Sequence, residues 1–177
     1  MKIAFYKGTR SGVAGAYSIG VRKMTKGKYS HVELIFSDGV SASSSYSDGG
    51  VRFKEIIYDP DKWDIFYLPS ELEDKAYRWF KKHEGQKYDI LGNVFFAVPL
   101  VGDSDSRWSC AEAVAEAICI KDSWRFHPNL LAAVILTFIN KGSNMNALYV
   151  SPDDLTPTPD EPVEDTGGDT LPKKPPK

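Results

Sequence analysis

The interpretation of this 177-residue chain starts from one stretch, Arg107-Trp108-Ser109-Cys110-Ala111-Glu112. Ser109 and Glu112 are three residues apart and form a capping box. In this motif the serine oxygen accepts a first-turn amide, and the glutamate reaches back to the cap amide. The residues that follow, 111–118, are mostly strong helix formers. The sequence therefore predicts a helix that begins at Cys110.

The predicted position of Cys110 gives its thiol special surroundings. The first turn of a helix carries the positive end of the helix dipole and amides that lack an intrahelical partner. Such amides favour the thiolate, which is the nucleophilic form of cysteine, and they can hold a developing oxyanion. A helical cysteine also occurs as a small apolar packing residue. The rest of the chain has to separate these two interpretations.

Composition and charge limit the classes of function. A net charge of −2 indicates no binding of nucleic acid or of another polyanion. The N-terminus lacks a long apolar region, so we expect synthesis in the cytoplasm without a signal peptide. The longest apolar run, 130–139, is too short to span a bilayer, so we expect no transmembrane segment. The two cysteines and three histidines have no disulfide-framework or zinc-site spacing, and we expect neither a metal nor a cofactor.

The N-terminal half is typical of short strands separated by turns. We expect strands over 2–7, 30–36, 40–46, 51–57 and 63–68, which together form an antiparallel meander. Gly8 to Lys28 is interpreted as a mildly basic, solvated loop. Alternation in the fourth of these strands places Arg52 and Lys54 outward.

Three helices are expected after the strands. Ser70 and Glu73 form a second capping box, and the helix that they open ends at Gly85. Its buried stripe comprises Leu72, Ala76, Trp79, Phe80 and His83. The Cys110 helix should bury Cys110, Val114, Ala117 and Ile118, with Glu112 and Glu116 outside. An apolar segment, 91–101, and a polar loop, 102–106, precede that helix, and a last helix covers 130–140.

The composition changes after Tyr149. Residues 151–177 contain seven of the eleven prolines and no aromatic residue, and they carry a net charge of −4. Such a segment buries too little apolar surface to fold alone. The sequence therefore predicts one domain over 1–150 and a disordered or extended acidic, proline-rich tail over 151–177.

His31 is the best candidate for a base that activates the thiol, because its predicted strand face also carries the polar Glu33. The neighbouring strand offers Ser41 and Ser43 as further residues that could orient the ring. A half-buried structural histidine is the alternative interpretation of His31. The other two histidines are better explained structurally, since His83 ends a helix stripe and His127 precedes Pro128 as a cap or surface residue.

Three motifs in this order resemble a known group of enzymes. They are His31 within Ser-His-Val-Glu-Leu-Ile-Phe, the segment Gly85-Gln86-Lys87-Tyr88-Asp89, and the helix start Trp108-Ser109-Cys110-Ala111-Glu112. The pattern resembles the circularly permuted papain-like cysteine hydrolases related to NlpC-type cell-wall peptidases, the YiiX-like proteins and lecithin–retinol acyltransferase. In that group the histidine strand precedes the cysteine helix. Alanine stands here where serine is common after the cysteine. Residues 29–57 also resemble uncharacterised bacteriophage proteins.

The resemblance implies an α+β fold, with a papain-like (permuted) antiparallel β-sheet packed against helices and the cysteine at a helix N-terminus. It implies Cys110 as nucleophile and His31 as base, with Glu33, Ser41 or Ser43 as the orienting residue. Tyr88, Trp108 and Ser109 would flank the substrate cleft. The implied reaction is cleavage of an amide bond, and the implied partner is a peptidoglycan or peptide substrate.

Two alternatives remain open at this point. One is a phage virion structural or interaction protein on the same fold, with little or no activity and with the 151–177 tail bound to other virion proteins. The other is a lipid acyltransferase or thioesterase that uses the same residues.

Overall fold

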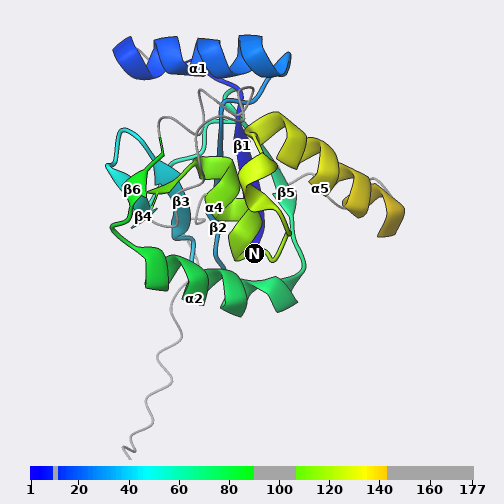
Figure 1. Ribbon diagram of the computed structural model, residues 1–177. Coiled ribbons are helices and arrows are strands. Elements are labelled where there is room, and N and C mark those ends of the chain that lie inside the picture. Colours follow the sequence, from blue (N-terminus) through cyan, green and yellow to red (C-terminus); the bar gives the residue numbers. More distant parts are fainter. Residues whose placement is uncertain (10–11, 90–106, 143–177) are drawn as a thin grey trace, which may run out of the picture.

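The structure, a computed structural model, describes residues 1–9, 12–89 and 107–142 (Figure 1). These residues form an α+β fold in which a sheet packs against helices, as predicted. The strands are β1 (Lys2–Tyr6), β2 (His31–Ile35), β3 (Ser41–Ser45), β4 (Gly50–Lys54), β5 (Trp63–Tyr67), β6 (Lys87–Tyr88) and β7 (Arg107–Trp108). The helices are α1 (Gly12–Thr25), α2 (Glu73–His83), α4 (Cys110–Ala117) and α5 (Pro128–Gly142), with 3-10 turns at Ser70–Leu72 and Ser123–Arg125.

The strand order of the seven-stranded sheet is β5-β1-β2-β3-β4-β6-β7, and only β6 and β7 pair in parallel. The part β2-β3-β4 is the predicted antiparallel meander. The prediction is wrong for β5, which crosses the sheet to pair with β1 instead of β4. Hydrophobic alternation determines which face of a strand is buried, but it does not determine which strand lies beside it.

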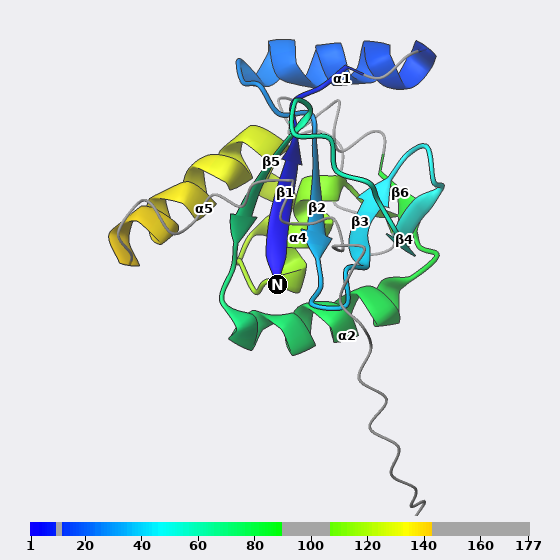
Figure 2. The same ribbon diagram turned by 180° about the vertical axis from the view of Figure 1, so that it is seen from behind.

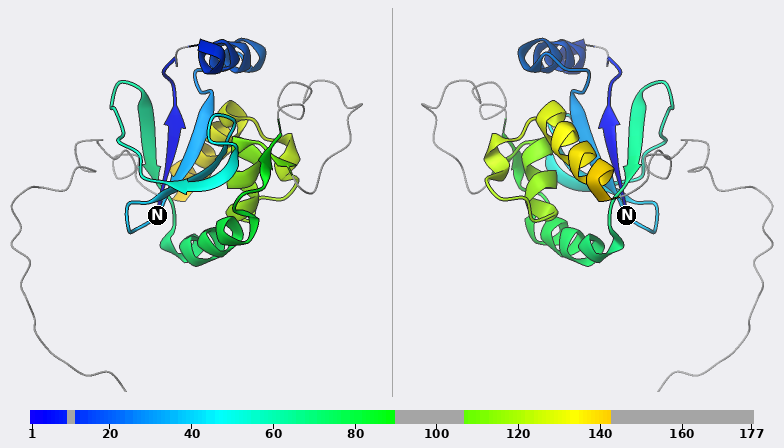
Figure 3. Two further views of the ribbon diagram at one scale, coloured as in Figure 1. Left: turned by 90° about the vertical axis from the view of Figure 1, so that its left-hand side faces the viewer. Right: turned by 90° about the vertical axis from the view of Figure 1, so that its right-hand side faces the viewer.

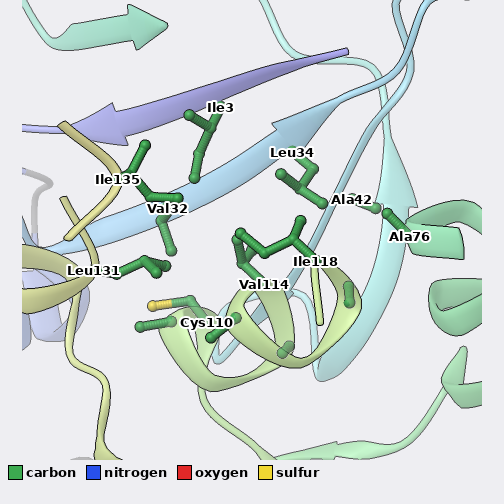
Figure 4. Packing of buried hydrophobic residues seen from close by; sticks show 14 of the residues in the cluster. Ile3, Val32, Leu34, Ala42, Ala76, Cys110, Val114, Ile118, Leu131 and Ile135 are labelled. Carbon is green, nitrogen blue, oxygen red and sulfur yellow. The ribbon is translucent and has the colours of Figure 1, made fainter. Parts of the chain in front are cut away.

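The two faces of the sheet are covered differently. The face of Val32 and Leu34 carries the larger core, in which Val114 of α4 and Leu131 of α5 pack (Figure 4). Figure 3 shows α2, α4 and α5 together on this side of the sheet. The opposite face, seen in Figure 2, holds a smaller cluster of buried residues, namely Ala4, Tyr6, Ile35, Trp63 and Ile65. Both faces of β2 are therefore buried, including that of His31 and Glu33.

The region predicted as a loop, Gly8 to Lys28, contains helix α1, so that prediction is wrong. Figures 1 and 2 show α1 lying across one end of the sheet. Gly15 of this helix is buried, and a residue this small lets the helix approach its neighbours. Arg22 holds the helix to the end of β1 by donating hydrogen bonds to the carbonyls of Lys7 and Gly8. These tertiary contacts outweigh the low helix propensity of the segment.

The start of α2 also differs from the prediction. Ser70 begins a 3-10 turn that has no side-chain cap, so the predicted capping box is absent from these residues. The Glu73 carboxylate instead accepts the Ser37 amide at 2.7 Å and pairs with the N-terminal ammonium of Met1 at 3.2 Å. Of the predicted buried stripe, Ala76 and Phe80 are buried, whereas Leu72, Trp79 and His83 are half-buried, and the helix ends at His83.

Several predictions concern residues outside those that the structure describes, namely the apolar segment 91–101, the polar loop 102–106 and the tail 151–177. The part of the predicted 1–150 domain that is described ends at residue 142. Among the described helices, none combines the length and the apolar character that crossing a bilayer requires.

Candidate active site

The helix that carries the thiol begins as predicted. Cys110 is the first residue of α4, and both arms of the capping box are present. The Ser109 amide donates to Oε2 of Glu112 at 3.1 Å, and the Glu112 amide donates to Oγ of Ser109 at 3.2 Å. Glu112 was expected outside the core but is buried, because its carboxylate is occupied by this cap. Glu116 is exposed, as predicted.

A hydrogen bond links strand β3 to strand β7, the strand that leads into helix α4. The hydroxyl of Ser44 donates to the carbonyl of Trp108, two residues before Cys110, at 2.7 Å. Strands β2 and β3 pair at Leu34 and Ile35, near the far end of β2. Nearer the start of β2, the contact with β3 is made by a side chain, because the Ser43 hydroxyl donates to the Val32 carbonyl at 2.7 Å. The N-terminus of α4 thus lies beside the start of β2, where His31 is located.

His31 interacts with two partners. Its Nε2 lies 2.7 Å from Oε1 of Glu33, and its ring also interacts with Cys110. Burial alone would lower the pKa of His31, but the charges of Cys110 and Glu33, with hydrogen bonds to both, raise that pKa from 6.5 to about 9. Since Nε2 faces Glu33, Nδ1 is the ring nitrogen that remains for Cys110. The His31 imidazole thus interacts with the Cys110 thiol on one side and with the Glu33 carboxylate on the other.

Glu33 is fully buried, with a relative exposure of 0%. Burial alone would raise its pKa, but hydrogen bonds from Arg52 and His31 and their charges lower that pKa to about 2. The Arg52 guanidinium binds both carboxylate oxygens, with Nη1 to Oε2 at 2.7 Å and Nη2 to Oε1 at 2.6 Å. Glu33 is therefore an ionised acceptor that faces the His31 ring.

The prediction that Arg52 points outward is wrong, because its side chain is only 13% exposed and pairs with Glu33. Its Nε donates to Oδ2 of Asp48 at 2.9 Å, and Lys54 donates to Oδ1 of the same carboxylate at 2.9 Å. Sequence reasoning missed Arg52 and Asp48. The available signal was an acidic residue inside an apolar strand, since a buried carboxylate requires a cation nearby.

The two serines proposed as orienting residues have other partners. Ser41 Oγ shares a hydrogen bond with the Tyr58 hydroxyl at 2.7 Å. Ser43 Oγ donates to the carbonyl of Val32. Of the three candidates named from the sequence, Glu33 is the one that the structure brings to His31.

The residues expected near a substrate cleft are packed against other side chains. Tyr88 is buried, and its ring meets the edge of Tyr46 at a centroid distance of 6.1 Å. The Trp108 ring is half-buried against Trp79 at 4.9 Å and against His83 at 5.4 Å. Ser109 serves as the helix cap.

The other two histidines have the structural roles that the sequence indicated. His83 stacks on Trp79 at 4.1 Å, and its Nδ1 lies 2.7 Å from the Trp79 carbonyl oxygen. His127 caps α5, where its Nδ1 accepts the amide of Leu130 at 3.2 Å. The second cysteine, Cys119, is free and exposed beyond the end of α4. His31 is thus the histidine that interacts with the buried Cys110.

This arrangement contains the parts of a nucleophilic site. A thiol lies at the positive end of a helix, an imidazole lies beside it, and an ionised carboxylate holds the second ring nitrogen. The first turn of α4 presents the amides of Cys110 and Ala111 beside the sulfur, where they could bind an oxyanion. Comparison with protein-family models, with curated proteins and with solved structures gives no match to this chain.

Proposed function

We propose that the protein is a cysteine hydrolase that cleaves an amide bond, with Cys110 as nucleophile, His31 as proton carrier and Glu33 as the residue that orients the imidazole. One observation carries this proposal, namely the burial of His31 between a helix-start cysteine and an ionised glutamate. A histidine kept only for packing needs neither partner. The order of the three residues, with the histidine strand before the cysteine helix, also agrees with the resemblance to permuted papain-like hydrolases.

The reaction follows from the two ring nitrogens. The Cys110 thiolate attacks the substrate carbonyl carbon, a C–S bond forms, and first-turn amides of α4 bind the oxyanion. His31 gives the proton on Nδ1 to the leaving amine as the C–N bond breaks, which leaves a thioester. His31 then takes a proton from water, the resulting hydroxide attacks the thioester, and the C–S bond breaks to release the acid. Throughout these steps Glu33 accepts a hydrogen bond from Nε2–H and stabilises the imidazolium.

The substrate class rests on the resemblance. Cell-wall peptidases of that group point to a peptide amide of peptidoglycan, and residues 29–57 point to a phage-type enzyme that would be associated with the virion. The same three residues could serve a lipid acyltransferase or a thioesterase, since both reactions also pass through an acyl-cysteine. A virion protein without activity would keep the fold but show no turnover.

Substrate and mechanism can be tested together. The full chain is incubated with purified peptidoglycan, and released muropeptides and new amino groups are measured by mass spectrometry. Parallel reactions contain an acyl ester and a thioester. We expect amide cleavage that Cys110→Ala abolishes and that His31→Ala lowers by about 10²–10⁴-fold. Cys119→Ser is the matched control and should retain full activity, because that thiol is exposed and lies outside the site.

Three outcomes would contradict the proposal. Cleavage that survives Cys110→Ala would show that another group performs the reaction. Turnover of the ester or thioester alone would identify an acyltransferase or thioesterase. No turnover of any substrate, with correct folding, would favour the inactive virion protein.

Thiol chemistry provides a second test that needs no substrate. Iodoacetamide alkylation of each cysteine is followed by peptide mass spectrometry in the wild type and in His31→Ala. We expect the histidine substitution to slow alkylation of Cys110 and to leave Cys119 unchanged, so that Cys119 serves as an internal control. Equal rates at Cys110 in both proteins would show that His31 does not activate the thiol.

A further inference from the structure

The Glu33 carboxylate is held from two directions. Its Oε1 meets both Nε2 of His31, at 2.7 Å, and Nη2 of Arg52, at 2.6 Å, while Oε2 accepts Nη1 of Arg52. A planar guanidinium that binds both oxygens fixes the plane of the carboxylate as well as its position. The direction of the lone pair that faces His31 is therefore set by Arg52.

Arg52 is in turn held by Asp48. Three of its N–H donors are used, two by Glu33 and one by Asp48, whose other oxygen binds Lys54. The charges alternate in sign along this line, from a Lys54 side chain that is 51% exposed to a Glu33 side chain that is 0% exposed. Each buried charge thus has an opposite charge beside it, which the low dielectric of the interior demands.

The sheet register explains how Arg52 reaches across a whole strand. Arg52 lies directly opposite Ser43, so the two side chains share a face of the sheet. In the pairing of β2 with β3, Ile35 lies opposite Ser41, and alternation along the two strands places Glu33 and Ser43 on the same face as these two residues. Glu33, Ser43 and Arg52 thus project from one face of β2, β3 and β4, and the residue on the middle strand is small. The small side chain of Ser43 is compatible with the Arg52 guanidinium reaching Glu33 two strands away.

We propose that Arg52, supported by Asp48, is a positioning residue of the site, which holds the Glu33 carboxylate in the orientation in which it receives the Nε2–H of His31. This inference rests on the proposed function only for its effect on catalysis. The positioning itself is a statement about His31 and can be measured without any substrate.

The decisive variant is Arg52→Lys, which keeps the charge but cannot bind two oxygens in one plane. Charged and titratable groups facing His31 or Glu33 come from several elements: Cys110 on α4, Glu33 on β2, Arg52 on β4, and Tyr58 before β5. Because the lysine preserves the positive charge among these groups, a change in the NMR signals of His31 reports a change in orientation and not the loss of a charge.

Asp48→Asn is the milder second variant, since it leaves the contact between Arg52 and Glu33 in place. It serves as the test if Arg52→Lys fails to fold. Lys62→Met, which removes an exposed ion pair with Asp59, is the control.

The readout is NMR of the full chain with labelled histidine. In the wild type we expect a downfield Nε2–H proton for His31 and titration above its ordinary pKa. Arg52→Lys should weaken or abolish the downfield proton, move the titration toward lower pH, and slow alkylation of Cys110 at neutral pH by about tenfold, the effect of one charge-assisted hydrogen bond. Asp48→Asn should change all three in the same direction and by less, and Lys62→Met should change none.

The two proposals fail separately. If Arg52→Lys and Asp48→Asn fold and lower thermal stability while the His31 proton and titration stay as in the wild type, Arg52 is merely structural and the positioning inference is wrong. If the His31 signals shift as expected but no amide, ester or thioester is cleaved, the positioning inference holds and the proposed function is wrong.

Discussion

Replacing Glu33 with glutamine tests the buried charge at the centre of the site. Burial raises the pKa of Glu33, but hydrogen bonds from Arg52 and His31 and their charges more than offset it, so that the pKa falls from 4.5 to about 2. At about 1.4 kcal/mol per pKa unit, the folded state gains about 3 kcal/mol from this charge. Removing one partner of a buried ion pair costs about 3–5 kcal/mol in other proteins. The two estimates agree, so Glu33→Gln should lose about 3 kcal/mol at pH 6.

The pH dependence gives the sign of the effect. A carboxylate with a depressed pKa stabilises the fold above its unfolded pKa, here 4.5, and that stability is lost as the pH falls through about 2. The wild type should therefore lose its advantage over Glu33→Gln between about pH 5 and pH 2. His31 has a raised pKa, so its contribution changes only as the pH rises from 6.5 through about 9. Measurements at pH 6 and below thus isolate Glu33.

The assay is urea unfolding at several values between pH 6 and pH 2, followed by tryptophan fluorescence. At pH 6 the variant should unfold at a urea concentration lower by about 1–3 M. Glu116→Gln, which changes an exposed glutamate of α4, is the matched control and should behave as the wild type. A variant as stable as the wild type at pH 6 would show that the buried charge of Glu33 does not stabilise the fold. A deficit that persists unchanged at pH 2 would assign the loss to packing and not to charge.

Three further substitutions test local features. Ser109→Ala removes the cap of α4 and should cost about 1 kcal/mol in chemical denaturation; an unchanged midpoint would show that the cap is dispensable. Cys119→Gly should raise stability by about 1 kcal/mol, because Cys119 has a φ of 65° that glycine adopts without strain; an unchanged or lower melting temperature would contradict this. Asn129→Ala should lower the melting temperature and cost about 2 kcal/mol, because the Asn129 amide binds both backbone groups of Tyr29 and the hydroxyl of Thr25. A melting temperature equal to that of the wild type within the error of differential scanning fluorimetry would show that these hydrogen bonds of Asn129 contribute little to stability.

Local patterns predicted the features that depend on neighbours in the chain. The capping box at Ser109 and the helix start at Cys110 follow from residues three positions apart, and both are confirmed. The alternation along β2 correctly separated Val32 and Leu34 from His31 and Glu33. Such short-range patterns work because dihedral preferences and first-turn hydrogen bonds involve few residues.

Three of the failures concern Arg52, Glu112 and helix α1, whose burial or contacts the local pattern does not show. Alternation placed Arg52 on the face opposite the main core, but it could not show that this face is also covered. Glu112 was judged by helical position alone, whereas its carboxylate is buried in the cap. Helix α1 was missed because its glycine-rich sequence has a low helix propensity, whereas the hydrogen bonds of Arg22 to Lys7 and Gly8 form only in the folded chain.

Local residue patterns were enough to predict a helix that begins at Cys110, a strand that carries His31, and the shortlist of Glu33, Ser41 and Ser43 as residues that could orient the ring. The folded chain selects Glu33 from those three candidates, and it adds Arg52. The reason is that an orienting hydrogen bond depends on the register of β2, β3 and β4 and on the burial of a charge that needs an opposite charge beside it. Both are properties of the assembled sheet, because no local stretch of the chain contains all the partners.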